Sequence, residues 1–340
     1  MRSTHTGRLT WLAKSRARSC IASLCALAAL CGCTNAPAAP HRTATCCRDL
    51  LSPPSPQARP PVVLREILTS SPAGPVRGWL ARIDLTSPQI QVVVTPPLED
   101  AIDGKREALL QSTDVFARNL FAAQPTPPLQ LIAINANFFS NEGGSKNYKP
   151  GVPSDIIGLS ISAGGVVSPP RTFAALGDPA LLIWDKRAEI DRITPQLLAR
   201  RMADEPIVAA VAGVGASESD KATGSAMLSG GEITARDARV YATQRHPRTA
   251  AGTADNGRTL VLIAIDGRQP GWSVGMTLPE LAELLQAEGC TDALNLDGGG
   301  STAIVMLDGA GALTTNRVSD KRFRPVANNL AVIVRGSQSP

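Results

Sequence analysis

The residues best suited to chemistry lie near the end of the chain, where an aspartate precedes three glycines. The segment reads Asp297-Gly298-Gly299-Gly300-Ser301-Thr302. Consecutive glycines let the backbone approach a ligand closely and can turn N–H groups towards an anion. A carboxylate directly before such a loop can serve as a base or a nucleophile, or it can simply cap the turn. The segment therefore predicts a site for an anionic ligand with Asp297 at its edge.

Common nucleotide-binding and hydrolase motifs do not fit this region. Residues 298–303 match the pattern GxGxxG/A, but that pattern needs a following helix, and the next residues, STAIVML, are β-branched and apolar. The chain has no Walker A sequence, and Gly158–Ser162 lacks the second glycine of the G-x-S-x-G nucleophile motif. The sequence therefore argues against a dinucleotide-binding domain and against a serine-hydrolase elbow.

A β-hairpin is predicted to carry two further charged residues. Arg248–Ala254 and Arg258–Asp266 flank Asp255-Asn256-Gly257, and Asn-Gly between two β-rich runs is a strong hairpin signal. With Asn256-Gly257 as the loop, Arg248 pairs with Ile265 and lies beside Asp266. We expect a cation and a carboxylate to meet at the open end of this hairpin, either as a functional pair or as a structural ion pair.

A helix and a short strand follow. Thr277-Leu278-Pro279-Glu280 is a capping box, so Glu280 is expected to be a cap rather than a catalyst, and the helix ends near Gly289. The apolar run Ala293–Leu296 then leads to Asp297. This strand–helix–strand unit predicts a right-handed crossover between parallel strands, with Asp266 and Asp297 at the same sheet edge.

The rest of the chain predicts one large domain, residues 62–336, of the α+β or mixed α/β class, with a twisted mixed β-sheet flanked by helices. A helix is expected at Asp114–Ala123, with Asp114 as its N-cap. Strands are expected at Val62–Leu68, Gly78–Asp84, Ile90–Thr95, Leu129–Phe139, Ile156–Ser162, Ala180–Asp185 and Ile207–Val211.

Composition restricts the function. The chain has 340 residues, 34 Lys and Arg against 29 Asp and Glu, and 4% aromatic residues. Residues 1–32 hold five of the cationic residues and no acid, so the remainder is formally neutral. A nucleic-acid partner is therefore not expected. Beyond Cys33 there are three cysteines (Cys46, Cys47 and Cys290) and two histidines (His41 and His246), so neither a metal site nor a cofactor is predicted.

The N-terminus is predicted to direct export. Five cationic residues precede the apolar run Ser19–Leu30, which is typical of a signal peptide over residues 1–32. Leu30-Cys31-Gly32-Cys33 resembles a bacterial lipobox, which would make Cys33 a lipidated membrane anchor at the outer membrane or in the periplasm. The alternative is plain secretion with cleavage near Ala36–Ala39. Residues 33–61 are rich in Pro and Ala and are predicted to be a tether.

The motifs together resemble the phosphodiester glycosidase family, over about Ile132 to Val334. Asn295–Ser301 resembles the family's NLDGGGS, Arg248-Thr249-Ala250 its RTA, and Arg324–Asn328 its RPVxN. Asp266-Gly267-Arg268 with Ser273, Gly275 and Glu280 resembles DGR…S-x-G…E. Asn135–Phe139 is similar to NGGFF, with both glycines replaced by Ala136 and Asn137.

The resemblance implies hydrolysis of a sugar-1-phosphodiester, on envelope or exopolysaccharide material. Asp297 or Asp266 would then be the base or nucleophile at the sugar carbon, with Arg248 as the third catalytic candidate. The candidate substrate-binding residues are Asn135, Asn137, Phe138, Arg268, Ser273, Gly298, Gly299, Gly300, Ser301, Arg324 and Asn328. His246 is a further possible ligand contact. The alternative function is a surface lipoprotein that binds glycan without turnover.

Overall fold

A computed structural model describes residues 60–98, 106–141, 147–171, 177–214, 225–235 and 242–336. All of them belong to the unit Ala58–Pro340. The predicted signal peptide, the lipidation site Cys33 and nearly all of the tether, with Cys46 and Cys47, lie outside the described residues. Within those residues, no helix is long and apolar enough to cross a membrane.

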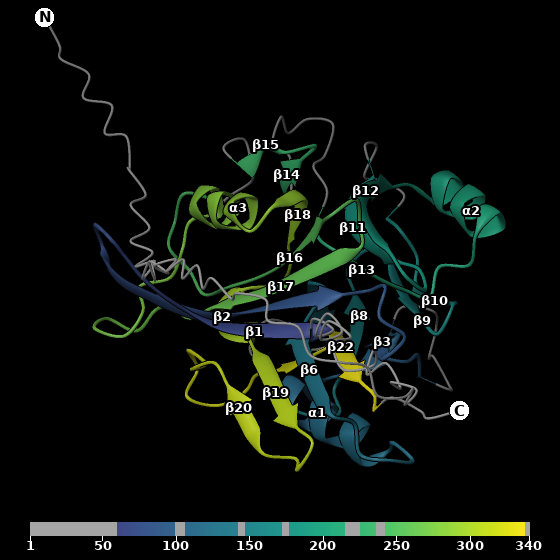
Figure 1. Ribbon diagram of the computed structural model, residues 1–340, viewed down its shortest axis with the longest axis horizontal. Helices are drawn as coiled ribbons and strands as arrows, with labels where there is room; N and C mark the ends of the chain where they lie inside the picture. Colours follow the sequence, from purple (N-terminus) through teal and green to yellow (C-terminus); the bar gives the residue numbers. More distant parts are fainter. Residues whose placement is uncertain are drawn as a thin grey trace, which may run out of the picture. The chain divides into compact units, whose positions relative to one another are not determined.

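The largest sheet has seven strands in the order β1-β2-β17-β16-β18-β14-β15 (Figure 1). In that order they are β1 (Val62–Ser71), β2 (Gly74–Asp84), β17 (Thr259–Ile265), β16 (Arg248–Ala254), β18 (Cys290–Asn295), β14 (Ala226–Ser229) and β15 (Glu232–Ile233). Every neighbouring pair is antiparallel. The strands that carry the predicted site, β16, β17 and β18, lie in the middle of this sheet.

Two five-stranded antiparallel sheets accompany it. One consists of β10 (Gly165–Ser168), β9 (Ser160–Ser162), β13 (Ala209–Ala212), β11 (Asp178–Ile183) and β12 (Ala188–Ile193). The other consists of β20 (Leu313–Thr315), β19 (Ile304–Asp308), β6 (Gln130–Asn135), β22 (Asn329–Val334) and β3 (Ile90–Val94). Short strands form two smaller sheets, β21 (Pro325–Val326) with β5 (Gln111–Ser112), and β4 (Ala108–Leu109), β8 (Pro153–Ile156) and β7 (Phe139–Asn141).

The main core lies between the three larger sheets, and helices cover their other faces. Leu262 of β17, Ile134 of β6 and Leu181 of β11 belong to one buried cluster. Helix α3 (Leu278–Ala287) buries Leu281 and Leu285 against the opposite face of the seven-stranded sheet. Helix α1 (Thr113–Ala122) packs on β6 and β19, and α2 (Pro195–Asp204) buries Leu198 in a cluster with β11 and β13.

The prediction of a mixed sheet flanked by helices is wrong. The protein is mainly β, with 46% of the described residues in strands and 14% in helices, and all of its sheets are antiparallel. Strands β17 and β18 do run in the same direction, but β16 lies between them and is antiparallel to both. Every residue of β16 and of β17 is buried. Such continuous burial is typical of parallel strands, whereas here it arises because an antiparallel sheet is covered on both faces.

The predicted hairpin register is confirmed. Arg248 pairs with Ile265 and Ala254 with Thr259, and Asp255, Asn256 and Gly257 all have positive φ in the turn. The capping box of α3 is also confirmed, because the Thr277 hydroxyl and the Glu280 carboxylate each accept a backbone N–H. The sequence therefore predicts the local geometry here, even though it does not predict the sheet class.

Other element boundaries differ from the predictions. Helix α1 begins at Thr113 with Ser112, not Asp114, as its N-cap. The strand predicted over Leu129–Phe139 ends at Asn135 and resumes as β7, because residues 136–138 form a loop. Helix α2 was not predicted, although Thr194 caps it and Pro195 occupies its first turn.

Candidate active site

The candidate site lies where the ends of three strands meet. Arg248 begins β16, Asn295 ends β18, and the loop after β6 reaches the same place. The Asp297 N–H donates to the carbonyl of Ala136 (3.0 Å), and Asn135 Nδ2 donates to the carbonyl of Asp297 (2.6 Å). These two bonds tie the glycine loop to the second sheet and fix the position of Asp297.

A pocket of about 330 Å³ opens at this junction. Its described lining residues are Phe138, His246, Arg248, Arg268, Asn295, Asp297, Gly298, Gly299, Gly300 and Arg324. Eight of them are among the residues that the sequence marks as catalytic or substrate-binding. The other two are His246, which the sequence analysis named as a further ligand contact, and Asn295. The pocket thus joins residues from segments far apart in the chain.

Asp297 is held in a surrounding that resists its ionisation. Burial raises the pKa of its carboxyl group to about 6, although a hydrogen bond from Ser301, the charge of Arg324 and the N–H of Gly298 all lower it. A carboxyl with a pKa close to neutral can exchange protons readily in the physiological range. Asp297 therefore has the property expected of a general base or acid.

Arg248 supplies a deeply placed cation. Its side chain is buried, the residue being 6% exposed, and its guanidinium donates to the carbonyls of Met276 (3.1 Å) and Gln244 (2.8 Å). Burial and the neighbouring charge of Arg268 lower the pKa of Arg248 to about 10. The group remains protonated at neutral pH, so an anion entering the pocket would relieve an electrostatic penalty.

The three glycines allow two more guanidinium groups to approach the backbone. A methyl group placed on Gly300 would lie 1.9 Å from Arg324 Nη2, and one on Gly299 would lie 3.0 Å from Arg268 Nη2. The N–H of Gly299 already donates to Pro247, and that of Ser301 donates to Gly298. The loop therefore contributes close packing, and the arginines supply most of the donors available to an anion.

Both of these arginines are oriented by neighbours. Arg324 donates from Nε to Asp320 (3.1 Å) and lies over the ring of Tyr148, 4.4 Å from its centroid. Arg268 is exposed, has φ +58°, and places Nη2 3.3 Å from Nδ1 of His246. Burial, with the charges of Arg248 and Arg268, lowers the pKa of His246. These contacts hold cations on two sides of the pocket.

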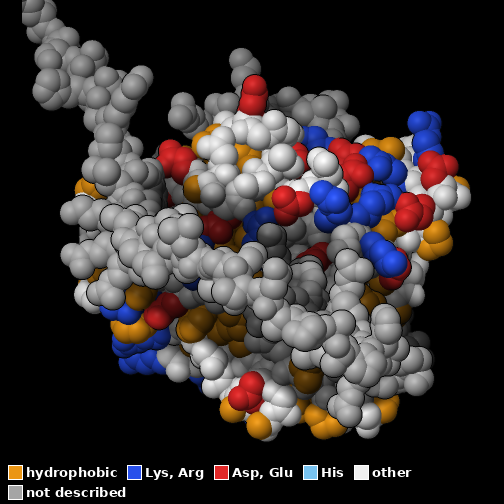
Figure 2. Space-filling model, in the orientation of Figure 1, with side chains coloured by type: hydrophobic (Ala, Val, Ile, Leu, Met, Phe, Trp, Pro, Cys, Tyr) orange, Lys and Arg blue, Asp and Glu red, His pale blue; other side chains and the backbone are white. Residues whose placement is uncertain are grey.

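Arg201, on another part of the surface, is paired with acids. On α2 and β12, Arg201 bonds Glu189 (2.7 Å) and Asp191 (2.8 Å). Figure 2 shows this intermixing of blue and red side chains at the upper right, over α2 and β12. Arg248 donates to two carbonyl oxygens. The pocket thus contains both kinds of arrangement, because Arg324 pairs with Asp320 as Arg201 pairs with its acids.

Asp266 lies outside the pocket and is hydrogen-bonded to neighbouring side chains. Its carboxylate accepts hydrogen bonds from Trp272 Nε1 (2.8 Å) and Asn316 Nδ2 (3.0 Å). Its carbonyl accepts from Ser273 Oγ (2.6 Å), which in turn accepts the N–H of Arg77 (3.1 Å). Burial raises the pKa of Asp266, whereas these donors lower it. The structure therefore does not bring Asp266 and Asp297 into one pocket, and Ser273 belongs to the support of Asp266.

The three predicted substrate-binding asparagines are fully buried behind the pocket. Asn135 Oδ1 accepts hydrogen bonds from Thr249 (2.7 Å) and the N–H of Ala303 (3.0 Å). Asn137 Oδ1 accepts from Asn328 Nδ2 (2.9 Å). Neither Asn137 nor Ala136 has a positive φ, so the loop accommodates the loss of both family glycines without strain. These asparagines position the loop rather than line the pocket.

Sequence reasoning did not single out Asn295. It lines the pocket two residues before Asp297, and alternate residues of a strand share a face. That alternation was the signal that could have identified it. No group of three or more His, Cys, Asp or Glu side chains among the described residues could hold a metal ion. The thiol of Cys290 is buried, in no disulfide within that part of the chain, and burial raises its pKa to about 12.

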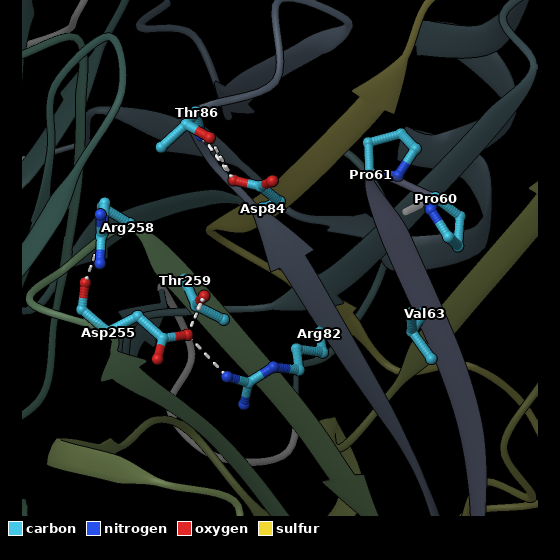
Figure 3. Close-up of a pocket in the computed structure, with 9 residues that line it drawn as sticks. All are labelled: Pro60, Pro61, Val63, Arg82, Asp84, Thr86, Asp255, Arg258 and Thr259. Atoms are coloured by element: carbon cyan, nitrogen blue, oxygen red, sulfur yellow. Dashed lines mark hydrogen bonds and ion pairs between the residues drawn. The ribbon is translucent and has the colours of Figure 1, made fainter. Parts of the chain in front are cut away.

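A second hollow, of about 580 Å³, lies at the opposite end of the β16–β17 hairpin (Figure 3). Its charged groups bond one another, because Arg82 reaches Asp255 (2.8 Å) and Thr86 donates to Asp84 (2.6 Å). Its polar groups are thus largely satisfied without a ligand. The smaller pocket is the better candidate for chemistry.

A pocket with one carboxyl group of raised pKa and three guanidinium groups is typical of a protein that acts on an anionic substrate. Residues 130–333 match the model of the phosphodiester glycosidase family. This segment is more than half of the chain, and the chain therefore belongs to the phosphodiester glycosidase family.

Two solved structures illustrate what this chain is similar to. The catalytic domain of zebrafish N-acetylglucosamine-1-phosphodiester alpha-N-acetylglucosaminidase, described as auto-inhibited by its pro-peptide, matches with a TM-score of 0.55 and 19% identity. The match covers 82% of this chain and 85% of that chain. A Burkholderia pseudomallei K96243 structure described as "Putative exported protein" matches with a TM-score of 0.47 and 17% identity, over 78% of this chain and 75% of that one.

One sequence relative is similar over a shorter segment. The SPbeta prophage-derived uncharacterized protein YomE of Bacillus subtilis strain 168 is 39% identical over 88 residues. These residues are 26% of this chain and 13% of the length of YomE.

Proposed function

We propose that the protein hydrolyses a glycosyl phosphodiester, releasing a free sugar and a phosphomonoester. The observation that carries this proposal is the joint placement of Asp297 with Arg248, Arg268 and Arg324 around one pocket. Membership of the phosphodiester glycosidase family supports the same reaction. The three cations bind the phosphate, and the carboxyl group of Asp297 acts at the sugar.

The chemistry requires fewer acids than ordinary glycoside hydrolysis. Most glycosidases use two carboxyl groups, one of which protonates a poor alkoxide leaving group. A phosphomonoester leaves readily as an anion, so guanidinium groups that stabilise its charge can replace the acid. Among the described lining residues, Asp297 is the single carboxyl group. One carboxylate with three arginines is therefore sufficient for this reaction.

In the proposed reaction Asp297 acts as a general base. A water oxygen forms a bond to the anomeric carbon while the bond from that carbon to the phosphate oxygen breaks. Asp297 accepts the proton that the water loses, and the electron pair of the broken bond leaves with the phosphate. A pKa of about 6 suits a base more than a nucleophile. This assignment predicts inversion at the anomeric carbon, which proton NMR of the first sugar product would test.

The activity is tested with purified protein and a panel of sugar-1-phosphodiesters. We expect turnover by the unchanged protein and a loss of about a thousandfold or more in Asp297→Asn. Asp255→Asn, which alters the aspartate at the other end of the hairpin, is the matched control and should retain activity. If the folded protein binds glycan but turns over no panel member, the protein is instead a non-catalytic glycan-binding module.

We further propose that this domain is exported and anchored by a lipid at Cys33, through the tether of residues 33–61, and that it acts on envelope or exopolysaccharide material. The cationic N-terminus, the apolar run Ser19–Leu30 and the lipobox-like residues support this. Cys33→Ser should move the protein from the membrane fraction to the soluble fraction, whereas Cys31→Ser should not. A soluble unchanged protein would contradict the anchor and leave plain secretion.

A further inference from the structure

An unpartnered amide oxygen lies in the wall of the pocket. Asn295 is 6% exposed, and its Oδ1 finds no hydrogen-bond donor within the described part of the chain. A buried acceptor without a donor destabilises a folded protein. A ligand that brings a donor to this oxygen removes that penalty, and the terminal torsion of an asparagine is soft enough for the amide to turn towards the ligand.

Other buried asparagines near the site either have hydrogen-bonded side-chain oxygens or lie away from the pocket wall. Asn135 Oδ1 accepts two hydrogen bonds, and Asn316 Oδ1 accepts the N–H of Ile304 (2.8 Å). Asn328 Oδ1 is also without a donor, but Asn328 does not line the pocket. Among the described residues, Asn295 alone combines a buried, unpartnered side-chain oxygen with a place in the pocket wall.

The backbone fixes where this amide lies relative to Asp297. Asn295 N–H donates to Ser225 (2.9 Å), and Asp297 N–H donates to Ala136 (3.0 Å), so both residues are anchored. Residues two apart in an extended chain share a face and are separated by about 6.6 Å. Both side chains line the same pocket, so the amide of Asn295 faces a bound substrate beside the carboxyl group of Asp297.

We propose that Asn295 Oδ1 accepts a hydrogen bond from the donor on the sugar carbon next to the anomeric carbon, and so selects sugars that carry a hydroxyl or an acylamino group there. This inference rests on the proposed function, because it places the anomeric carbon at Asp297. The other ring neighbour of that carbon is the ring oxygen, which carries no hydrogen. A donor adjacent to the reacting carbon must therefore come from the second carbon.

The remaining polar groups of the pocket leave this role to Asn295. Arg248, Arg268 and Arg324 are donors only and suit the phosphate, while Asp297 is engaged with the attacking water. The two ring nitrogens of His246 already lie 3.3 Å from Gln244 Oε1 and from Arg268 Nη2. Hydrogen bonds to the second-carbon hydroxyl of a sugar strengthen as a glycosidic transition state forms. Asn295 is thus a specificity-determining residue that contributes most in the transition state.

The test compares three substrates with the same phosphodiester leaving group. They carry a hydroxyl, an acetamido group or only hydrogen at the second sugar carbon. We expect Asn295→Ala to lower kcat/KM by about ten- to a hundredfold for the substrates that carry a donor, and to leave the 2-deoxy substrate unchanged. The ratio between variants cancels the differing intrinsic reactivity of the sugars. The donor-bearing substrate that loses more identifies the natural substituent.

A matched control separates specificity from folding. Asn329→Ala removes another buried asparagine, one whose Nδ2 bonds Gln111 away from the pocket, and it should leave the ratios between the three substrates unaltered. An equal loss of kcat/KM on all three substrates in Asn295→Ala would overturn the inference, because the residue would then have a structural role. No loss on any of them would also overturn it, because the residue would then not contribute to the reaction.

A binding measurement keeps this inference distinct from the proposed function. If the unchanged protein hydrolyses none of the three substrates, the proposed function fails. Calorimetric titration with the matching sugar-1-C-phosphonates then decides the inference. A preference for donor-bearing phosphonates that disappears in Asn295→Ala would support it. No preference, or no binding of any phosphonate, would overturn it.

Discussion

The two ends of the β16–β17 hairpin hold the same kinds of residue in opposite electrostatic conditions. At the turn, Asp255 accepts hydrogen bonds from Thr259 (2.6 Å) and Arg82 (2.8 Å), and these contacts lower its pKa. At the open end, burial raises the pKa of Asp297 to about 6. The ionised form of Asp255 is stabilised by its neighbours, whereas the ionised form of Asp297 is destabilised by burial.

This comparison shows that the size of a cavity does not identify a site. The hollow at the turn has about 580 Å³ and the pocket at the open end about 330 Å³. In the larger one Arg82 and Asp255 pair across neighbouring strands. In the smaller one Arg248 donates to the carbonyls of Met276 and Gln244, and burial raises the pKa of Asp297. Groups held in unfavourable states are typical of functional sites.

The largest contrast is expected between two arginines on strands of the same sheet. Under the proposed function, Arg248→Gln should lower kcat/KM by about a hundred- to a thousandfold, because it removes a buried cation from the phosphate site. Arg82→Gln removes the partner of Asp255 and should leave kcat/KM within twofold, or about 0.4 kcal/mol. Steady-state kinetics with both proteins checks this. Equal losses of kcat/KM in the two variants would show that the two ends of the hairpin do not differ in function.

A second contrast uses a pair of glycines. Gly300→Ala would force a methyl group to within 1.9 Å of Arg324, so we expect kcat/KM to fall by about ten- to a hundredfold as Arg324 is displaced. Gly257→Ala would meet the carbonyl of Ala188 at 2.3 Å in a turn with φ +79°. It should lower the melting temperature while each folded molecule keeps its kcat/KM. Loss of activity in the turn variant would show that the ends are coupled.

The pH dependence follows from the same contrast. If ionised Asp297 is the base, kcat/KM falls about tenfold per unit as the pH drops below the pKa of about 6, and it levels off above that value. The pKa of Asp255 is lowered, so Asp255 does not titrate in this window. The pH dependence of kcat/KM reports the pKa of this group in the free protein. A profile flat through pH 6 would contradict the assignment.

The smallest effect concerns stability, and its sign differs between the two ends. Because the folded-state pKa of Asp297 is raised, the folded protein binds more protons than the unfolded chain between about pH 4 and 6. Its contribution therefore turns unfavourable as the pH rises through that window.

At pH 7, Asp297→Asn should then increase the free energy of unfolding by about 3 kcal/mol, and below pH 4 it should have little effect. Asp255→Asn should decrease it by less than about 1 kcal/mol, because that aspartate is half-exposed. Denaturant titrations at both pH values measure the two differences. If Asp297→Asn were less stable than the unchanged protein at pH 7, the raised pKa of this carboxyl group would be contradicted.

The sequence predicts those parts of the fold that depend on local chemistry. Asn256-Gly257 fixes the hairpin register, and Thr277 with Glu280 fixes the start of α3. The sheet class could not be predicted in this way, because strands buried on both faces lose the alternation that marks an antiparallel sheet. Partners far apart in sequence, such as β6 beside β19 and β22, determine that burial.

The candidate site was predictable to the same extent. Arg248, Asp297 and the glycines come from motifs with chemical meaning, and they line one pocket. The placement of Asp266 depends on Trp272 and Asn316, and no local pattern reveals that their side chains bond its carboxylate. Strand alternation with Asp297 could have placed Asn295 in the pocket wall, but the missing hydrogen-bond donor of its Oδ1 is visible only in the folded structure.

Arg268, with its left-handed backbone and its side chain over Gly299, has a consequence for how this family member can change over generations. Glycine or asparagine would adopt that conformation more easily, and each would also remove a positive charge. Selection for stability alone would thus favour replacing Arg268, and only selection for the reaction would retain it. Under the proposed function, the identity of residue 268 in a descendant lineage records whether its members act on phosphodiesters.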